Sequence, residues 1–243
     1  GHGDRVAIYS PNGNWTYQEL LDKSNQIAYV LVEDLGLVSG NRVILRSLNN
    51  PMLAACWLAV IKAGGIVVTT IAMLRGKEIN TIVEQSQATI SLCDVRLHED
   101  MQKATEFSDQ LQHVIYFNNG DSAESLESLM KEKSKQFDNY RSDSSDVAMI
   151  AFTSGTTGKP KGAVHSHHAI LAVCETFSRQ VIKPGSDDIF IGTPSLAFVY
   201  GLGGLLLLPL PARAAHVLLE VVRITSLMGA RGSYQATICL HDP

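Results

Sequence analysis

The chain has 243 residues, of which 45% are hydrophobic and 18% are charged, so it can bury a sizeable core and is not compositionally disordered. The 20 Lys and Arg residues are outnumbered by 24 Asp and Glu, which gives a net charge of -4. Because the basic residues are also scattered, the composition argues against nucleic acid as a partner.

Cysteine content and hydropathy limit the classes of protein further. The four cysteines (Cys56, Cys93, Cys174 and Cys239) lie far apart without a CxxC pair, which predicts neither a zinc site nor a disulfide framework. The apolar stretch 202–210 is too short for a transmembrane helix, and the N-terminus has no signal-peptide pattern. We therefore expect a cytoplasmic protein without a membrane partner. Since the first residue is not Met, we also expect the sequence to start inside a longer chain.

Segments typical of strands alternate with segments typical of helices along most of the chain. This alternation predicts an α/β fold with a mostly parallel sheet flanked by helices. We expect strands at residues 5–9, 42–47, 66–70, 89–93, 113–117, 147–152 and 188–191. We expect helices at about residues 17–35, 51–63, 78–87, 100–107, 123–133 and 167–181.

Local signals mark some of these helix ends. Thr16 and Glu19 have the spacing of a capping box, and Pro51 suits the first turn of the helix that follows it. The polar stretch 118–146 contains few core-forming residues, which indicates an exposed connection around one short helix.

The most informative segment is residues 152–162, with the sequence FTSGTTGKPKG, directly after an apolar strand. Its three glycines let backbone N–H groups approach an anion, its four hydroxyls donate to phosphate oxygens, and its two lysines supply positive charge. A flexible linker is the alternative, but a linker needs neither the lysines nor the strand. The segment therefore predicts a phosphate-binding loop that turns into a second extended segment at 163–165.

The spacing of this segment excludes the Walker loop of ATPases and GTPases. Only two residues separate Gly155 from Gly158, where that loop needs four before its Gly-Lys pair. Pro160 follows Lys159, where the Walker loop has a Ser or Thr hydroxyl for the metal.

Residues 153–162, called the signature loop below, resemble the signature of the adenylate-forming superfamily of acyl- and aryl-CoA synthetases, peptide-synthetase adenylation domains and luciferases. The resemblance extends upstream to WTYQEL at 15–20 and to residues 59–70, and it covers nearly everything up to Glu220. Residues 70–79 and SLCD at 91–94 look most like benzoate and 2-aminobenzoate CoA ligases. The resemblance implies the N-terminal portion of the large domain of such an enzyme.

For function, the resemblance implies an ATP-dependent acid–thiol ligase. An aryl acid such as benzoate or 2-aminobenzoate would attack the α-phosphate of ATP to give acyl-AMP and pyrophosphate, and CoA would then displace AMP. The implied cofactors and partners are ATP, Mg²⁺, CoA and a small carboxylic acid. Medium-chain fatty acids and acetate stay open as substrates, and a homodimer stays open as an assembly.

The resemblance assigns two groups of site residues. The ATP phosphates would contact the loop residues Thr153, Ser154, Gly155, Thr156, Thr157, Gly158 and Lys161, with Gly162 helping the chain to bend. The acid would contact an aromatic segment whose members here are Phe198, Tyr200 and Gly201, although a hydrophobic core uses the same side chains.

His165, His167 and His168 invite a metal-site interpretation. Their adjacent and alternate spacing does not bring three rings onto one ion, and no Asp, Glu or Cys stands nearby before Cys174. We therefore expect no metal held by the protein itself, and Mg²⁺ would be carried by the nucleotide.

Other motifs of the family are missing from the sequence. We find no Tyr-Gly-x-Thr-Glu segment, no Thr-Gly-Asp segment, no hinge and no small C-terminal domain. Residues 221–231 depart from the helix expected there, whereas 235–239 again resemble the family's next strand. We therefore expect residues 1–243 to form an incomplete N-terminal AMP-binding domain that is inactive alone. A non-catalytic nucleotide-binding domain and a structural remnant without ligand are the alternatives.

Overall fold

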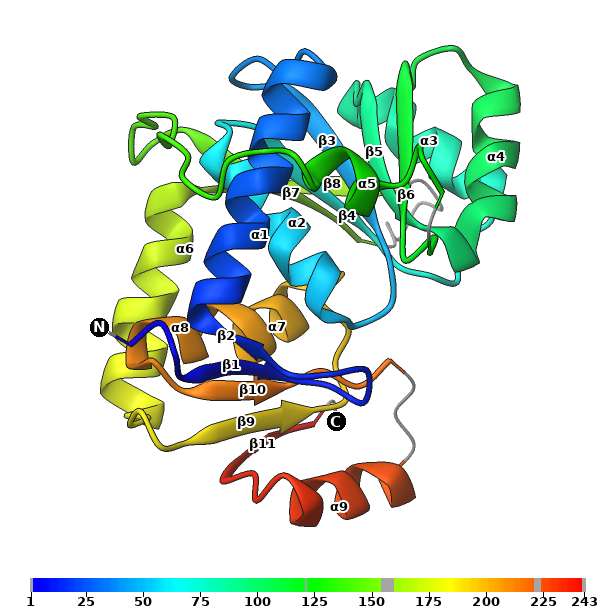
Figure 1. Ribbon diagram of the computed structural model, residues 1–243. Coiled ribbons are helices and arrows are strands. Elements are labelled where there is room, and N and C mark those ends of the chain that lie inside the picture. Colours follow the sequence, from blue (N-terminus) through cyan, green and yellow to red (C-terminus); the bar gives the residue numbers. More distant parts are fainter. Residues whose placement is uncertain (1, 121, 154–159, 221–223, 242–243) are drawn as a thin grey trace. The chain divides into compact units, whose positions relative to one another are not determined.

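A computed structural model describes residues 2–120, 122–153, 160–220 and 224–241. The chain forms two compact units. The first unit contains Gly1–Leu21, Leu48–Ala54 and His168–Pro243, and the second contains Asp22–Ser47 and Ala55–His167. Each unit is built on its own β-sheet (Figure 1).

The sheet of the first unit has five strands in the order β11-β9-β10-β1-β2. The strands are β1 (Val6–Tyr9), β2 (Trp15–Thr16), β9 (Ile189–Gly192), β10 (Ala215–Val217) and β11 (Ile238–Leu240). All neighbouring pairs are parallel except β1 and β2. On one face, Leu227 of helix α9 (Ile224–Ser233) packs with Ile191 and Val217. On the other face, Phe190 packs with Leu208 and Ala214.

The sheet of the second unit has six strands in the order β6-β5-β3-β4-β7-β8. The strands are β3 (Arg42–Arg46), β4 (Ile66–Thr70), β5 (Ile90–Asp94), β6 (His113–Phe117), β7 (Val147–Thr153) and β8 (Lys161–Ser166). All pairs are parallel except β7 and β8. Helices α3 (Gly76–Ser86) and α4 (His98–Phe107) cover one face, where Ile79 and Met101 pack with Ile44 and Val68.

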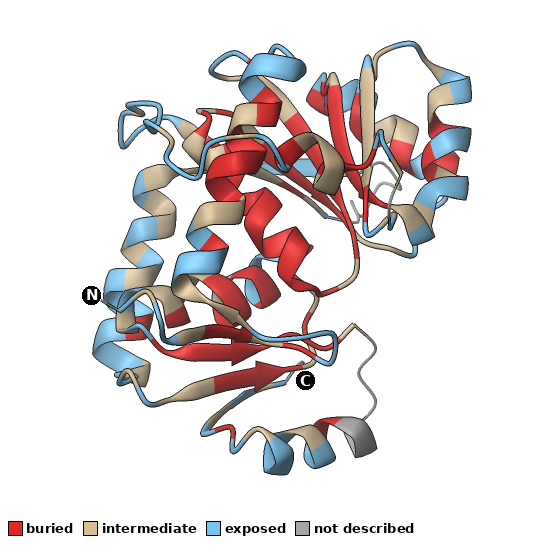
Figure 2. Cartoon of the chain, in the orientation of Figure 1, coloured by how far each residue is buried: buried red, intermediate tan, exposed pale blue. Residues whose placement is uncertain are grey.

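The remaining helices are short or cross from one unit to the other. The helices that cross are α1 (Tyr17–Tyr29) with its π-helical extension η1 (Val30–Asp34), α2 (Pro51–Lys62), and α6 (His167–Val173), which continues as η3 (Cys174–Ile182). The short helices are η2 (Val95–Leu97), α5 (Leu126–Met130), α7 (Val199–Leu202), η4 (Gly203–Leu207) and α8 (Pro209–Ala212). Buried residues concentrate in the central strands and in α2 (Figure 2).

The capping box predicted at the start of α1 is confirmed. The Thr16 backbone N–H donates to Glu19 Oε2 at 2.7 Å, and the Glu19 backbone N–H donates to Thr16 Oγ1 at 3.1 Å. Two otherwise unsatisfied donors of the first turn are thereby bonded, which fixes where the helix begins.

The predicted α/β fold with mostly parallel strands is confirmed, with differences of detail. The strands form two sheets because β9, β10 and β11 join β1. Strand β10 was not predicted, since three residues are too few for a periodic pattern to show. Helix α9 forms at Ile224–Ser233, although residues 221–231 depart from the family's sequence pattern.

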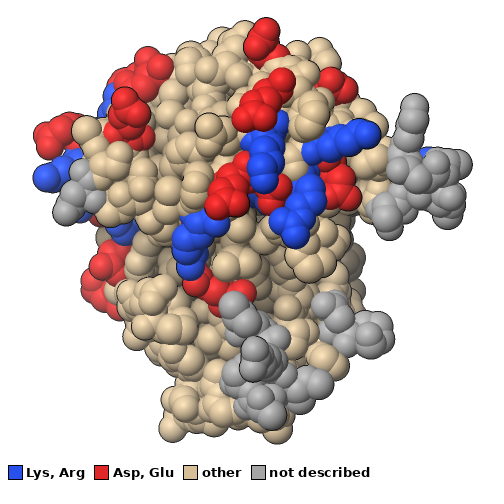
Figure 3. Space-filling view, turned by 90° about the vertical axis from the view of Figure 1, so that its right-hand side faces the viewer, with Lys and Arg blue, Asp and Glu red and all other residues tan. Residues whose placement is uncertain are grey.

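The charged surface is mixed. On the face shown in Figure 3, Lys and Arg side chains lie between Asp and Glu side chains. Ion pairs such as Arg75–Asp100, at 3.1 Å, bring opposite charges together. Within the described ranges, no helix combines the length and apolarity needed to cross a membrane.

Candidate functional site

The predicted phosphate-binding loop joins β7 to β8, the two antiparallel strands at one edge of the second unit's sheet. Thr153 and Lys161 are paired across this hairpin, and Thr153 Oγ1 lies 3.5 Å from the Lys161 carbonyl oxygen. Both residues are exposed at the same end of the hairpin, and the Thr153 hydroxyl donates to the Lys161 carbonyl oxygen. The other predicted phosphate contacts lie outside the described residues: Ser154, Gly155, Thr156, Thr157 and Gly158.

Gly162 is needed for space rather than for an unusual backbone angle. A Cβ at this position would lie 2.9 Å from Ile150 Cγ2 and 3.3 Å from Phe152 Cζ. The glycine therefore lets β8 run close over the side chains of β7. The sequence indicated a bend here, whereas the structure shows a strand residue in close approach.

The carboxyl end of β7 lies at the edge of the sheet where the other parallel strands of this unit also end. A buried polar network lies at this edge. Because β3 to β7 are parallel, all their carboxyl ends meet at this edge. Asp94, at the end of β5, is buried and accepts hydrogen bonds from Arg96 Nη2 at 2.6 Å, Asn118 Nδ2 at 2.8 Å and Ser47 Oγ at 3.2 Å. Burial alone would raise the pKa of Asp94, but the bonds from Arg96 and Asn118 hold it below its usual value.

Arg46 lies at the same edge, at the end of β3, and is fully buried. Its guanidinium donates to three backbone carbonyls of the segment that follows β4: Ile71 at 2.8 Å, Ala72 at 3.0 Å and Leu74 at 2.9 Å. The sequence analysis identified neither Arg46 nor Asp94. The sequence signal that could have found them is that each is a charged residue at the end of an apolar strand.

The predicted acid-binding residues lie in the first unit, around α7. Phe198 and Tyr200 are 49% and 48% exposed, so neither is packed into the core of the described residues. The Tyr200 hydroxyl donates to the His241 carbonyl oxygen at 3.3 Å. Gly201 is buried, and a Cβ there would collide with the carbonyl oxygen of Ser195.

Asn49 fixes the segment that leads to these aromatics. Its Oδ1 accepts from the Leu196 backbone N–H at 2.8 Å, and its Nδ2 donates to the Pro194 carbonyl oxygen at 2.9 Å. Asn49 is buried, so both bonds are shielded from water. The sequence alone did not identify Asn49, because its partners lie about 145 residues further along the chain.

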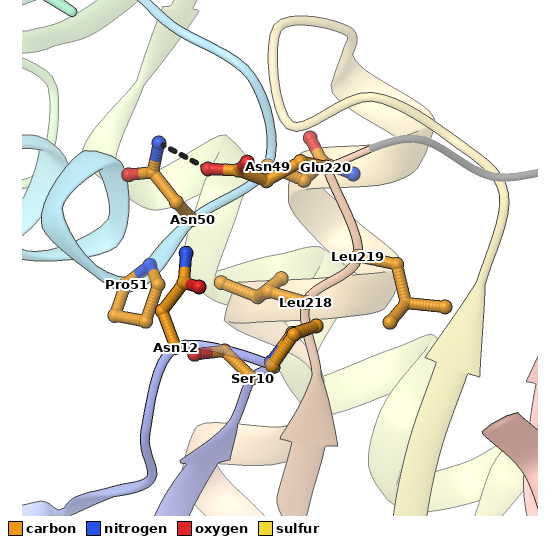
Figure 4. Close-up of a pocket in the computed structure, with 9 residues that line it drawn as sticks. Ser10, Asn12, Asn49, Asn50, Pro51, Leu218, Leu219 and Glu220 are labelled. Carbon is orange, nitrogen blue, oxygen red and sulfur yellow. Dashed lines mark hydrogen bonds between the residues drawn. The ribbon is translucent and has the colours of Figure 1, made fainter.

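A separate pocket of about 250 Å³ opens in the first unit, at the carboxyl ends of β1 and β10 and the start of α2 (Figure 4). It is lined by Ser10, Pro11, Asn12, Asn49, Asn50, Pro51, Leu218, Leu219 and Glu220. Asn50 Nδ2 donates to Glu220 Oε1 at 3.4 Å, and Asn50 Oδ1 caps α2 by accepting from the Leu53 N–H at 3.0 Å. None of the predicted site residues lines this pocket.

The three histidines considered as metal ligands lie at the end of β8 and the start of α6. Across the part of the chain that the structure describes, no group of three or more His, Cys, Asp or Glu side chains has the arrangement to hold a metal ion.

Comparison with known proteins gives consistent matches over almost the whole chain. A benzoate–CoA ligase of Thauera aromatica is 26% identical over 219 residues, which cover 90% of this chain and 41% of that protein. The peroxisomal OPC-8:0-CoA ligase 1 of Arabidopsis thaliana is 27% identical over 243 residues, covering 97% of this chain and 44% of that protein. The chain thus spans less than half the length of these relatives.

A solved structure shows the same fold. The crystal structure of an anthranilate CoA ligase in complex with anthranoyl-AMP has a TM-score of 0.93 at 21% identity, covering 98% of this chain and 46% of that one. The family model described as "AMP-binding enzyme" matches residues 1–240. The chain therefore belongs to the AMP-binding enzyme family.

Proposed function

We propose that the chain is the N-terminal part of an ATP-dependent carboxylic acid–CoA ligase and that its signature loop binds the phosphates of ATP. The observation that carries this proposal is the β7–β8 hairpin, which presents Thr153 and Lys161 together at the two ends of the loop. The family match over residues 1–240 and the CoA ligases among the relatives support it.

In the proposed first step, the substrate carboxylate attacks the α-phosphorus of ATP, the bond to the β-phosphate breaks, and pyrophosphate leaves. Negative charge builds up on phosphate oxygens during this step. The loop hydroxyls, backbone N–H groups and the Lys161 ammonium would stabilise that charge, and the loss of one such donor costs about 3 kcal/mol at comparable sites. In the second step, the CoA thiol attacks the acyl carbon and AMP leaves.

Mg²⁺ would be carried into the site by the nucleotide. The hydroxyls of the signature loop and the phosphate oxygens are hard oxygen ligands of the kind that Mg²⁺ prefers. When bound, the ion would neutralise part of the phosphate charge. The chain's own residues would orient the phosphates around it.

We propose an aryl acid, such as benzoate or 2-aminobenzoate, as the substrate. The half-exposed Phe198 and Tyr200 offer aromatic surface for such a ring, and the benzoate ligase among the relatives supports this class. Saturation-transfer NMR on the 243-residue protein tests it. We expect benzoate to receive saturation and octanoate and acetate to receive none, and Phe198→Ala to abolish the benzoate signal. A stronger signal from octanoate would contradict the aryl assignment.

A second candidate is a domain that binds nucleotide without turnover, and the coverage of less than half of each relative favours it for the 243-residue protein tested alone. Carboxylate-dependent ATP–pyrophosphate exchange separates the two. We expect this polypeptide to give no exchange at enzyme-like rates. Robust exchange would show that these residues suffice for adenylation.

We further propose the cytosol as the compartment. All four cysteines are free, which suits a reducing environment. Imaging of a fluorescent fusion in the host cell tests this, and localisation to an organelle would contradict it.

A further inference from the structure

The sequence contains two Asn-Gly pairs, and the structure places both in connections between elements. Asn12 and Gly13 lie in the turn that joins β1 to β2, whereas Asn119 and Gly120 lie between β6 and α5. Asparagine is among the chemically labile residues of proteins. An Asn-Gly pair is especially reactive, because glycine has no Cβ to hinder attack by its own nitrogen on the preceding side chain. The two pairs are therefore exposed to the same reaction in the same chain.

The reaction is deamidation through a succinimide. The backbone nitrogen of the glycine loses its proton and forms a bond to Cγ of the asparagine, the bond from Cγ to the side-chain nitrogen breaks, and ammonia leaves. Water then opens the ring. Addition of water at Cγ gives aspartate, and addition at the main-chain carbonyl carbon gives isoaspartate. Because the attacking nitrogen must give up any hydrogen bond that it donates, such a bond slows the reaction.

The Asn12-Gly13 pair is held by two hydrogen bonds. The Gly13 N–H donates to the Ser10 carbonyl oxygen at 3.2 Å, and Ser10 Oγ donates to the Gly13 carbonyl oxygen at 2.7 Å. Ser10 is buried, so its side chain holds the turn out of contact with bulk water. The Asn12 side chain lines the pocket of Figure 4. The nitrogen that would attack Asn12 is therefore already bonded.

The Asn119-Gly120 pair is held less firmly. Gly120 has a φ of 59°, which glycine adopts without strain, and a Cβ on it would meet open space. Neither the N–H nor the carbonyl oxygen of Gly120 forms a hydrogen bond with the residues that the structure describes. The main-chain carbonyl oxygen of Asn119 accepts one long bond, from the Ser122 N–H at 3.4 Å. The nitrogen that would attack Asn119 is therefore free to do so.

Exposure and hydrogen bonding predict opposite orders of reactivity. Asn12 is exposed and Asn119 is half-buried, whereas Gly13 and Gly120 are both exposed. Access of water to the side chain alone would make Asn12 the faster site. The hydrogen bonds of the glycines make Asn119 the faster site.

We propose that Asn119 is a site of spontaneous deamidation in the native protein and that the Ser10–Gly13 turn protects Asn12. The reaction consumes water and converts a side-chain carboxamide into a carboxylate. This inference goes beyond the proposed function and does not depend on it. Each event adds one negative charge to a net charge of -4.

The new carboxylate would enter a loop that already contacts two acidic side chains. Asn118, the preceding residue, donates from Nδ2 to Asp94 at 2.8 Å and from its backbone N–H to Glu127 at 2.7 Å. Isoaspartate at position 119 also lengthens the main chain next to Asn118. Deamidation therefore acts directly beside the polar network of Asp94.

Isotope labelling of the native 243-residue protein compares the two sites. The protein is incubated at mildly alkaline pH in water enriched in oxygen-18, digested at mildly acidic pH, and the two Asn-Gly peptides are followed by mass spectrometry. We expect label to enter Asn119 about 10-fold faster than Asn12 or more, since each of the two bonds at Gly13 slows attack about 2- to 12-fold. Equal rates, or a faster rate at Asn12, would overturn the inference.

Unfolding provides the first control. In concentrated urea the hydrogen bonds of both turns are lost, so the two labelling rates should converge. A ratio of rates that unfolding leaves unchanged would show that local sequence, and not the structure, sets the order, and would overturn the inference.

Two variants complete the test. Ser10→Ala removes the side-chain bond to Gly13 and should speed labelling of Asn12 about 2- to 12-fold while leaving Asn119 unchanged. Asn119→Gln should remove most of the acidic variant that accumulates in isoelectric focusing of aged protein. An unchanged rate at Asn12 in Ser10→Ala, confirmed as folded by thermal melting, would overturn the protective role of the turn. An acidic variant that persists undiminished in Asn119→Gln would overturn the assignment of Asn119.

Discussion

Gly162 lies directly across the β7–β8 hairpin from Phe152, and a side chain on Gly162 would press against Ile150 Cγ2 at 2.9 Å and Phe152 Cζ at 3.3 Å. Ile150 is β-branched and cannot easily turn away. We expect Gly162→Ala to lower the free energy of unfolding by about 1–2 kcal/mol through this crowding. Urea unfolding measures it. The exposed neighbour provides the control, because Ala163→Ser should change stability by less than about 0.5 kcal/mol. Equal stability of wild type and Gly162→Ala would contradict the close approach of the strands.

Gly201, a predicted acid-binding residue, and Gly203, two residues further along the chain, lead to opposite predictions for substitution by alanine. A Cβ on Gly201 would collide with the Ser195 carbonyl oxygen, whereas a Cβ on Gly203 has open space. We expect Gly201→Ala to cost about 2–3 kcal/mol, because backbone atoms cannot move aside as a flexible side chain would. Gly203→Ala should gain about 0.5–1 kcal/mol, since alanine loses less conformational entropy in a helix. Thermal unfolding of both variants tests the pair, and a shift of the same sign in both would contradict the packing described.

Asn49 supports the aromatic segment through its two bonds to Pro194 and Leu196. Truncation by Asn49→Ala leaves a buried N–H and a buried carbonyl without partners, which should cost about 2–3 kcal/mol in total. The exposed Asn12 lies in the same unit, and Asn12→Ala should cost less than about 0.5 kcal/mol. Denaturant unfolding of the two alanine variants gives both values. Indistinguishable midpoints would show that the Asn49 bonds contribute nothing net.

His216 is a fully buried imidazole in the middle of the first unit's sheet, paired with Ile8 of β1 and Phe190 of β9. Neither ring nitrogen has a partner among the described residues. Burial lowers the pKa of His216 from 6.5 to about 3. The native state therefore keeps His216 neutral at pH values where the unfolded chain binds a proton.

The sign of the pH effect follows from this difference. Between pH 6.5 and about 3, the unfolded state holds one more proton at His216 than the native state, so stability falls as the pH falls. The contribution is about 1.4 kcal/mol per pH unit once the unfolded chain is fully protonated there. We expect His216→Leu to reduce the slope of unfolding free energy against pH between pH 6 and 4 by about this amount. A slope equal to that of the wild type would mean that His216 is not buried in the uncharged form.

Local patterns predicted a large part of the fold. The capping box at Thr16, the strand before the signature loop and the extended segment after it all follow from neighbouring residues, and all are confirmed. The separation into two sheets was not predictable in this way, because it depends on β1 pairing with β10, more than 200 residues along the chain. The sequence gives no local sign of such a pairing.

The candidate site shows the same limit. The motif identified Thr153 and Lys161 because both belong to one contiguous stretch of sequence. The hairpin pairs these two residues. Arg46 and Asn49 were missed, since their contacts are with segments that only the fold brings near. Phe198 and Tyr200 were named from the sequence, but their degree of burial could not be predicted from it, because the segments that pack around them are distant in the chain.

Calorimetric titration of Mg-ATP into the 243-residue protein tests the central claim, that the signature loop binds nucleotide phosphates, most directly. We expect a saturable binding heat for the wild type and a Kd raised about 10-fold or more by Lys161→Ala, which removes a charged donor from the phosphates. Lys131, an exposed lysine of the same unit, provides the charge-matched control, and Lys131→Ala should leave the Kd unchanged. The absence of binding heat for the wild type, or equal Kd values for Lys161→Ala and Lys131→Ala, would contradict the claim.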